Sequence, residues 1–287
     1  MKKATKLRNL IANNDILIAP AVYDCISAKV AENSGFKIAF TSGFSLSASL
    51  LGKPDLGLLT ASEMIERIKH ISASVDIPII ADIDTGYGGV LNVMRTVNEV
   101  VIAGAGGIIL EDQKWPKRCG HFENKSVVPS SNHVQKIRAA IEARGDSELV
   151  IVARTDALSV HGLEEAIHRG RLYADAGADI VFIEAPQSKE QMIRIAKELE
   201  GIPLFANMIE GGKTPMLSSE ELATLGFKVC AFALSGLFSA TLGLSDCFRH
   251  LALHGNTGKL LDRMSFNDFK KLIELPKYLE LQERYKE

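Results

Sequence analysis

The chain has 287 residues, of which 46% are hydrophobic and 24% are charged, with a formal net charge of −2 at pH 7. Such a composition is typical of a globular protein with a substantial core, and the charge gives no reason to expect nucleic acid or a membrane surface as a partner. No window approaches the roughly 18 apolar residues of a membrane span, and the basic start is not followed by a signal peptide. Four scattered cysteines without a CxxC pair favour a reducing compartment, so we expect a cytoplasmic protein.

Strand-like and helical segments alternate along the chain. After an opening helix at 3–13, short apolar runs predict strands at 16–22, 37–41, 77–81, 107–110, 149–153, 179–183, 203–206 and 228–233. Amphipathic segments predict helices at 24–34, 60–74, 91–103, 132–144, 163–176, 189–200, 218–225 and 237–254. Eight βα units without a break in composition predict one (β/α)8 TIM-type barrel domain over 1–287. A doubly wound sheet is the weaker alternative, because residues 23–27 lack its glycine fingerprint.

Three further segments exceed what an ordinary barrel needs. The connections 42–59 and 112–131 are long for βα loops, and we expect them to be functional. Residues 255–287 form an amphipathic helical tail, which packs either across its own barrel or on a neighbouring subunit; we favour the neighbour.

Two carboxylates, Asp82 and Asp84, follow the 77–81 strand directly before a glycine-rich turn. Residues i and i+2 of a strand face the same side, and two like charges this close require a proton or a cation between them. Oxygen ligands of this kind favour Mg²⁺, with Mn²⁺ as a second possibility. Alternatively, one aspartate caps the next helix and the other is solvated.

Other predicted strands also end in polar residues, at the barrel end that holds the chemistry in barrel enzymes. Glu111 is a further candidate metal ligand, direct or through water, and Asp55 in the 42–59 loop is a fourth. Arg154 is predicted to clamp a carboxylate or phosphate, with a salt bridge to Glu111 or Glu184 as the alternative.

Polar backbone and side-chain groups complete the predicted substrate site. Small residues expose the backbone N–H groups of Ser42, Gly43 and Phe44, which are predicted to hold a second carboxylate. Asn207 ends the 203–206 strand, and Glu210 follows nearby.

The 112–131 loop carries the sequence Lys117-Arg118-Cys119-Gly120-His121. A thiol beside two cations and a histidine is expected to have a lowered pKa and to lie accessibly in a mobile loop. Cys119 is therefore predicted to be a proton donor or nucleophile, and Gly120 to let the loop fold over a substrate. The other three cysteines, Cys25, Cys230 and Cys247, are expected to be small buried hydrophobic residues.

Taken together, seven motifs resemble the isocitrate lyase/phosphoenolpyruvate mutase superfamily over roughly residues 16–235. They are Thr41–Phe44, Gly52–Asp55, Asp82–Gly88, Glu111–Gln113, Lys117–His121, Ala153–Asp156 and Ala206–Pro215. The resemblance implies a Mg²⁺-dependent site for α-oxygenated acids. It also implies a barrel whose eighth helix is exchanged with a partner, usually in a homotetramer.

Within the superfamily, the cysteine loop resembles that of the carbon–carbon lyases, which implies that Cys119 is the catalytic acid. The same resemblance implies catalytic roles for Arg154, Glu184 and His121. It places Lys117 and Arg118 with the substrate-binding residues. The 2-methylisocitrate lyases tend to have tyrosine in place of Phe40 and glycine in place of Phe44, so the bulky Phe44 favours a smaller dicarboxylate.

The resulting prediction is a Mg²⁺-dependent lyase that cleaves a C2- or C3-substituted malate by retro-aldol chemistry. The substrate would be of the 2-alkylmalate, 2,3-dimethylmalate or 2-methylisocitrate type. Three alternatives stay open: a phosphonomutase, an oxaloacetate hydrolase or decarboxylase, and a non-catalytic barrel that binds a metabolite.

Overall fold

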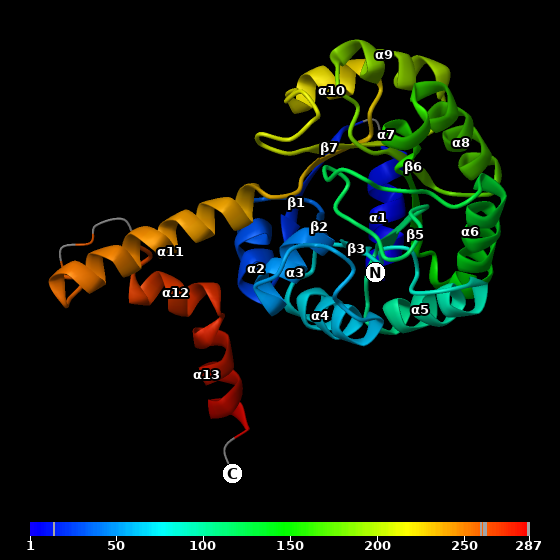
Figure 1. Ribbon diagram of the computed structural model, residues 1–287. Helices are drawn as coiled ribbons and strands as arrows, with labels where there is room; N and C mark the ends of the chain where they lie inside the picture. The colour runs from blue at the N-terminus through cyan, green and yellow to red at the C-terminus, as the bar shows by residue number, and fades with distance from the viewer. Residues whose placement is uncertain (14, 259, 261–262, 286–287) are drawn as a thin grey trace.

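The computed structural model describes residues 1–13, 15–258, 260 and 263–285, and it contains a closed eight-stranded barrel (Figure 1). All strands run parallel, each pairs with the next in the chain, and β8 pairs with β1. The strands are β1 (Leu17–Val22), β2 (Ala39–Thr41), β3 (Ile79–Asp82), β4 (Gly107–Glu111), β5 (Val150–Thr155), β6 (Ile180–Ile183), β7 (Leu204–Met208) and β8 (Val229–Phe232). The predicted TIM-type barrel is confirmed.

Helices cover the outside of the barrel between successive strands (Figure 1). They are α2 (Cys25–Asn33), α4 (Ala61–Ser74), α5 (Val90–Ile102), α6 (Ser130–Arg144), α8 (Leu163–Asp175), α9 (Lys189–Glu198) and α10 (Ser219–Leu225), with a 3-10 turn, η1 (Gly145–Ser147), after α6. Capping fixes several starts as predicted: Asp24 accepts from the amide of Ser27, and Thr60 forms a capping box with Glu63.

Helix α1 (Lys3–Ala12) closes the amino-terminal end of the barrel. Its Leu7 is fully buried and packs with the residues that fill the barrel interior. The close approach favours glycine at 107, because a Cβ there would lie 3.2 Å from Leu7 Cδ2 and 3.0 Å from the carbonyl oxygen of Val150.

Aromatic side chains fill the barrel interior below the carboxyl ends of the strands. Phe205 packs against Phe40 with ring centroids 5.9 Å apart, and against Phe182 at 4.7 Å. All three rings are at least 96% buried, so the polar groups at the carboxyl ends of the strands stand on an apolar floor.

The 42–59 connection is not a plain loop, because it contains α3 (Gly43–Leu51). Ser42 has an extended backbone before the first turn, and Gly52 ends the helix with φ 61°. The other long connection keeps residues 112–129 outside helices and strands, apart from a bridge between Gln113 and Val127. A short helix, α7 (Ala157–His161), also follows β5 and was not predicted.

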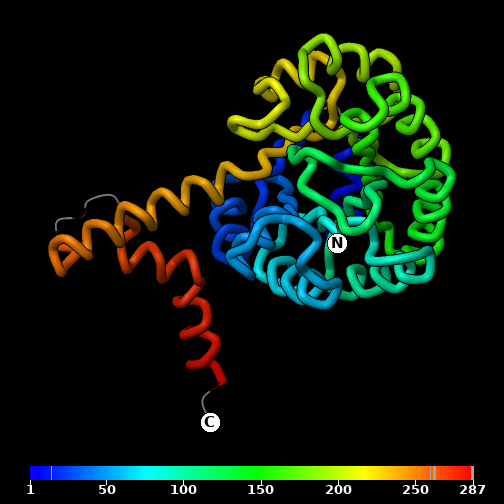
Figure 2. Tube along the Cα trace, viewed as in Figure 1, coloured from blue at the N-terminus to red at the C-terminus, as the bar shows by residue number. Residues whose placement is uncertain are grey.

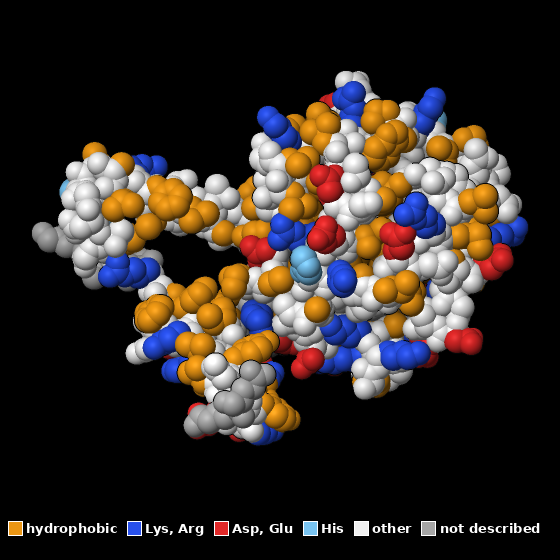
Figure 3. Space-filling model, turned by 90° about the horizontal axis from the view of Figure 1, so that it is seen from below, with side chains coloured by type: hydrophobic (Ala, Val, Ile, Leu, Met, Phe, Trp, Pro, Cys, Tyr) orange, Lys and Arg blue, Asp and Glu red, His pale blue; other side chains and the backbone are white. Residues whose placement is uncertain are grey.

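The carboxyl-terminal helices extend away from the barrel (Figures 1 and 2). Helix α11 (Ser235–His254) has no buried residue, and α12 (Phe266–Leu272) and α13 (Leu275–Arg284) follow it. Apolar side chains gather on this projecting part (Figure 3), and an ion pair of 2.6 Å between Lys29 and Glu274 connects it to α2. Among the described residues, no helix combines the length and apolarity that crossing a membrane requires.

Candidate active site

A small cavity lies at the carboxyl ends of the strands. Its lining brings together predicted residues from seven separate segments of the chain. They are Ser42, Gly43, Phe44, Asp55, Asp82, Cys119, Gly120, His121, Arg154, Glu184 and Asn207, with Ile209, Ala233 and Leu234. Two predicted substrate residues are exposed and do not line it: Arg118 and Glu210, whose carboxylate accepts from the Ser235 hydroxyl.

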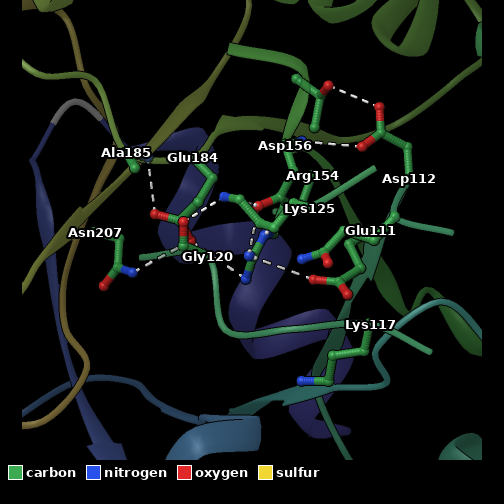
Figure 4. Close-up of polar contacts among 12 residues, drawn as sticks. Glu111, Asp112, Lys117, Gly120, Lys125, Arg154, Asp156, Glu184, Ala185 and Asn207 are labelled. Carbon is green, nitrogen blue, oxygen red and sulfur yellow. Dashed lines mark hydrogen bonds and ion pairs between the residues drawn. The ribbon is translucent and has the colours of Figure 1, made fainter. Parts of the chain in front are cut away.

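Arg154, at the end of β5, is held by three carboxylates (Figure 4). Its Nε and Nη2 donate to Asp156 Oδ2 and Oδ1 at 2.9 and 3.1 Å. Its Nη1 lies 3.2 Å from Glu184 Oε2, and its Nη2 lies 3.4 Å from Glu111 Oε2. The salt bridges that were the alternative prediction are therefore present, and they fix the guanidinium beside the cavity.

A buried network beneath Asp156 orients this end of β5 (Figure 4). Asp112 Oδ1 accepts from the amide of Asp156 at 2.9 Å. Asp112 Oδ2 accepts from the Thr155 hydroxyl, the Tyr173 hydroxyl and Arg169 Nη1 at 2.7, 2.8 and 2.9 Å. Sequence reasoning assigned Asp112 and Asp156 no role, although both directly follow predicted strand ends, which was the available signal.

Glu184, at the end of β6, is oriented by His121 and Asn207. The amide of Lys213 donates to His121 Nδ1 at 3.0 Å, so a neutral imidazole carries its proton on Nε2, which lies 3.3 Å from Glu184 Oε1. Asn207 Nδ2 donates to Glu184 Oε2 at 3.5 Å. Burial would raise the pKa of Glu184, but Arg154 and His121 outweigh it and hold that pKa below its ordinary value.

Two of the four predicted metal ligands, Asp55 and Asp84, pair with a lysine. Lys117 Nζ lies 2.7 Å from Asp55 Oδ1 and 2.5 Å from Asp84 Oδ1, with 4% of its side chain exposed. Asp82 Oδ1 accepts from the amide of Asp84, and Oδ2 from that of Gly43, at 3.0 and 2.9 Å. Lys117 thus contacts carboxylates and does not line the cavity. Gly43 does line it, but its amide donates to Asp82.

In the part of the chain that the structure describes, no three His, Cys, Asp or Glu side chains form a set of direct metal ligands. The donors nevertheless fit a hard cation. Burial raises the pKa of Asp84 to about 6 and that of Glu111 well above its ordinary value, and Glu111 Oε1 is buried without a hydrogen-bond partner. A cation relieves these costs, and oxygen donors suit Mg²⁺; in this structure Lys117 supplies the positive charge.

Cys119 lines the cavity, but its predicted low pKa is wrong. Burial raises the pKa of the thiol to about 11. The two neighbouring cations do not lower it, because Lys117 is paired with Asp55 and Asp84 and Arg118 is exposed. The thiol is therefore neutral at physiological pH.

The remaining cysteines differ from one another. Only Cys230 is fully buried, as was predicted for all three. Cys25 and Cys247 are half-buried.

Comparison with known proteins places these observations in a family. The family model described as phosphoenolpyruvate phosphomutase matches residues 7–251. Petal death protein of Dianthus caryophyllus is 43% identical, with 99% of this chain and 90% of that protein covered. Carboxyvinyl-carboxyphosphonate phosphorylmutase of Arabidopsis thaliana is 44% identical (98% and 84% covered), and 2,3-dimethylmalate lyase of Eubacterium barkeri is 41% identical (99% of each covered).

Solved structures agree with these relatives. A crystal structure of 2,3-dimethylmalate lyase matches with a TM-score of 0.94 at 36% identity, covering 100% of this chain and 96% of that one. Oxaloacetate acetylhydrolase in complex with 3,3-difluorooxalacetate also matches at 0.94, with 35% identity and coverage of 98% and 96%. Phosphonopyruvate hydrolase with oxalate and Mg²⁺ matches at 0.90, with 30% identity and all of both chains covered.

Proposed function

Because the chain belongs to the phosphoenolpyruvate mutase/isocitrate lyase superfamily, we propose that it is a Mg²⁺-dependent carbon–carbon lyase for a small substituted malate. The observation that carries the proposal is the position of Cys119, which lines one cavity with Arg154 and Glu184. A lyase of this kind must protonate a carbanion, and a thiol with a pKa of about 11 retains the proton it has to donate.

Substrate binding rests on the groups around the cavity. Arg154 has a planar fork that binds carboxylates, and it supplies the positive charge that attracts a dianion. His121 and Asn207 keep Glu184 in one orientation, so its carboxylate is placed to accept a hydrogen bond from the substrate hydroxyl. Asp82, Asp84, Asp55 and Glu111 would hold Mg²⁺, which when bound supplies Lewis-acid stabilisation of charge on the α-oxygen.

The reaction begins when a base of the site accepts the proton of the C2 hydroxyl. The C2–C3 bond breaks, C2 becomes the ketone of an α-keto acid, and the electron pair moves to C3 and its carboxylate. Cys119 donates a proton to C3, and the second product leaves as a carboxylate. The closed loop over the cavity excludes water while the carbanion exists.

The aromatic wall of the cavity favours a small dicarboxylate. Phe44 of α3 packs against Phe122 of the 112–129 loop with ring centroids 6.3 Å apart, and Phe44 lines the cavity. This aromatic pair occupies space on one wall, and it offers an apolar surface to a methyl or ethyl group. An alkyl-substituted malate suits such a wall better than a tricarboxylate does.

Hydrolysis of oxaloacetate is the second candidate. It is favoured by the small cavity and by the TM-score of 0.94 with oxaloacetate acetylhydrolase. The same arginine and the same carboxylates would bind oxaloacetate.

Steady-state assays with Mg²⁺ and coupled detection of keto acid separate the candidates. The panel is 2,3-dimethylmalate, 2-ethylmalate, citramalate, 2-methylisocitrate and oxaloacetate, with phosphoenolpyruvate followed by ³¹P NMR. Turnover of the substituted malates supports the lyase. Consumption of only oxaloacetate or phosphoenolpyruvate would refute it.

The proposal includes an assembly in which α11 of one subunit packs on the barrel of another, in a tetramer of helix-exchanged dimers. The apolar residues of α11 are unusually exposed, with Leu242 at 63% and Phe248 at 61%. Ile26 and Val30 of α2 are 39% and 43% exposed beside the place where an eighth barrel helix ordinarily packs. Sedimentation velocity tests this.

The double variant Leu242→Asp/Phe248→Asp is expected to be monomeric, whereas wild type and a Leu91→Asp control on α5, where the leucine is 75% exposed, stay tetrameric. A monomeric wild-type protein would refute the assembly.

A further inference from the structure

The loop over the cavity is held by two buried lysines, and the proposed chemistry explains only one of them. Lys117 pairs with the candidate metal ligands on one side. Lys125 lies eight positions further along the same loop, with only 1% of its side chain exposed. An ammonium group so deeply buried requires strong partners.

The partners of Lys125 belong to two different parts of the site (Figure 4). Its Nζ lies 2.8 Å from Asp156 Oδ1 at the end of β5, and it also donates to the carbonyl oxygen of Gly120. Gly120 stands between Cys119 and His121, so the lysine connects the turn that carries the thiol to the barrel.

Asp156 is also the carboxylate that receives two hydrogen bonds from Arg154, at 2.9 and 3.1 Å. One ammonium group therefore touches both the loop turn and the carboxylate that aligns the guanidinium. Arg154 is paired with the carboxyl groups of Glu111, Asp156 and Glu184, and Lys125 brings a second cation to Asp156. Without Lys125, one guanidinium would face three buried carboxylates and attract a dianionic substrate less strongly.

The turn lies directly on the guanidinium. A Cβ at Gly120 would be 2.5 Å from Arg154 Nη2 and 2.5 Å from Glu184 Cγ. The turn and the guanidinium are thus in direct contact, so a shift of one disturbs the packing of the other.

We propose that Lys125 is a positioning residue: it bridges the Gly120 carbonyl and the Asp156 carboxylate, and so couples closure of the loop to alignment of Arg154. The kinetic consequence rests on the proposed function, whereas loop closure itself is measurable without turnover. Lys125 contacts neither the cavity nor the thiol, so its effect is exerted through Gly120 and Asp156.

The chain contains a built-in reporter of this loop. Trp115 is its single tryptophan; it belongs to the same loop, is 46% exposed and packs edge-on against Tyr87 with centroids 6.2 Å apart. Opening of the loop would separate the two rings and expose the indole to a soluble quencher.

The experiment compares acrylamide quenching of Trp115 in wild type, Lys125→Met, Lys125→Arg and the control Lys189→Met, each with and without oxalate and Mg²⁺. Lys189 forms an exposed ion pair with Glu221 at the same 2.8 Å, so this control removes the same charge far from the loop. We expect Lys125→Met to raise the quenching constant at least about two-fold and to weaken oxalate binding by about ten-fold, with partial rescue in Lys125→Arg. Turnover should show a rise in KM that exceeds the fall in kcat.

The proposal would be overturned if Lys125→Met is folded, as judged by circular dichroism, and has the same quenching constant and the same oxalate affinity as the wild type. Should that variant not fold, Lys125→Gln keeps a donor for Gly120 but loses the charge, and the same two measurements decide. If wild type cleaves no malate, the proposed lyase activity fails, while quenching and oxalate binding still judge the role of Lys125.

Discussion

Replacing Cys119 by serine tests the chemistry most sharply, because it removes the proton donor and changes little else. A positioned general acid typically contributes about 10²–10⁴-fold to the rate, so kcat should fall by that factor, equivalent to about 3–5 kcal/mol in the barrier. KM should change little, since Arg154 and Glu184 stay in place. The half-buried Cys247 in α11 provides the matched control, Cys247→Ser, which should keep wild-type kcat.

The pKa of the thiol makes this prediction quantitative. With a pKa of about 11 in place of the ordinary 9.0, about 1% of Cys119 is ionised at pH 9, compared with about half for an unperturbed thiol. An acid is active when protonated, so activity should be lost only as the pH approaches 11.

The assay is the ratio of kcat for wild type to kcat for Cys119→Ser from pH 6 to pH 10, in which other titrating groups cancel. The ratio should stay constant to about pH 9.5. A ratio near one at every pH, or a decline already centred near pH 8.5, would show that the neutral thiol of Cys119 is not the proton donor.

Three further outcomes are expected. Gly120→Ala should lower kcat/KM by at least about ten-fold in steady-state assays, because its Cβ would overlap Arg154, and unchanged kinetics would contradict the packing. Burial lowers the pKa of His133 from 6.5 to about 4, so the unfolded chain binds a proton more readily than the folded one, and the free energy of unfolding falls by roughly 2 kcal/mol from pH 7 to pH 5. Urea titrations at the two pH values should show a smaller fall for His133→Phe. An equal fall in both proteins would exclude His133 as the cause. Chelation by EDTA should abolish turnover, and added Mg²⁺ should restore it. Turnover that survives chelation would show that the reaction does not depend on a metal.

Much of the fold follows from local patterns in the sequence. Most residues of the barrel strands are buried and apolar, as in Ile79–Ala81 of β3, and caps such as Thr60 mark helix starts. Helix α3 escaped prediction because Gly43–Leu51 lies among serines and glycines and has no side-chain cap to mark its start.

The site was predicted less completely, because neighbours in sequence need not face one another. Cys119 follows two cations in the chain, yet Lys117 turns toward Asp84 and Arg118 turns to solvent, so burial controls the pKa of the thiol. The carboxylate that pairs with Lys125 depends on the path of the loop, and the spacing of residues along the sequence does not reveal that path.

The central claim is carbon–carbon cleavage with protonation of the released carbanion, and ¹H NMR of 2,3-dimethylmalate in D₂O with Mg²⁺ tests it most directly. Cleavage of the C2–C3 bond predicts pyruvate and propionate in equal amounts, with a single deuterium at C2 of propionate, and no reaction in Cys119→Ser beyond the residual rate. The lyase activity would be contradicted by an unchanged spectrum for each substituted malate. If the same sample converts oxaloacetate to oxalate and acetate, the protein is a hydrolase instead.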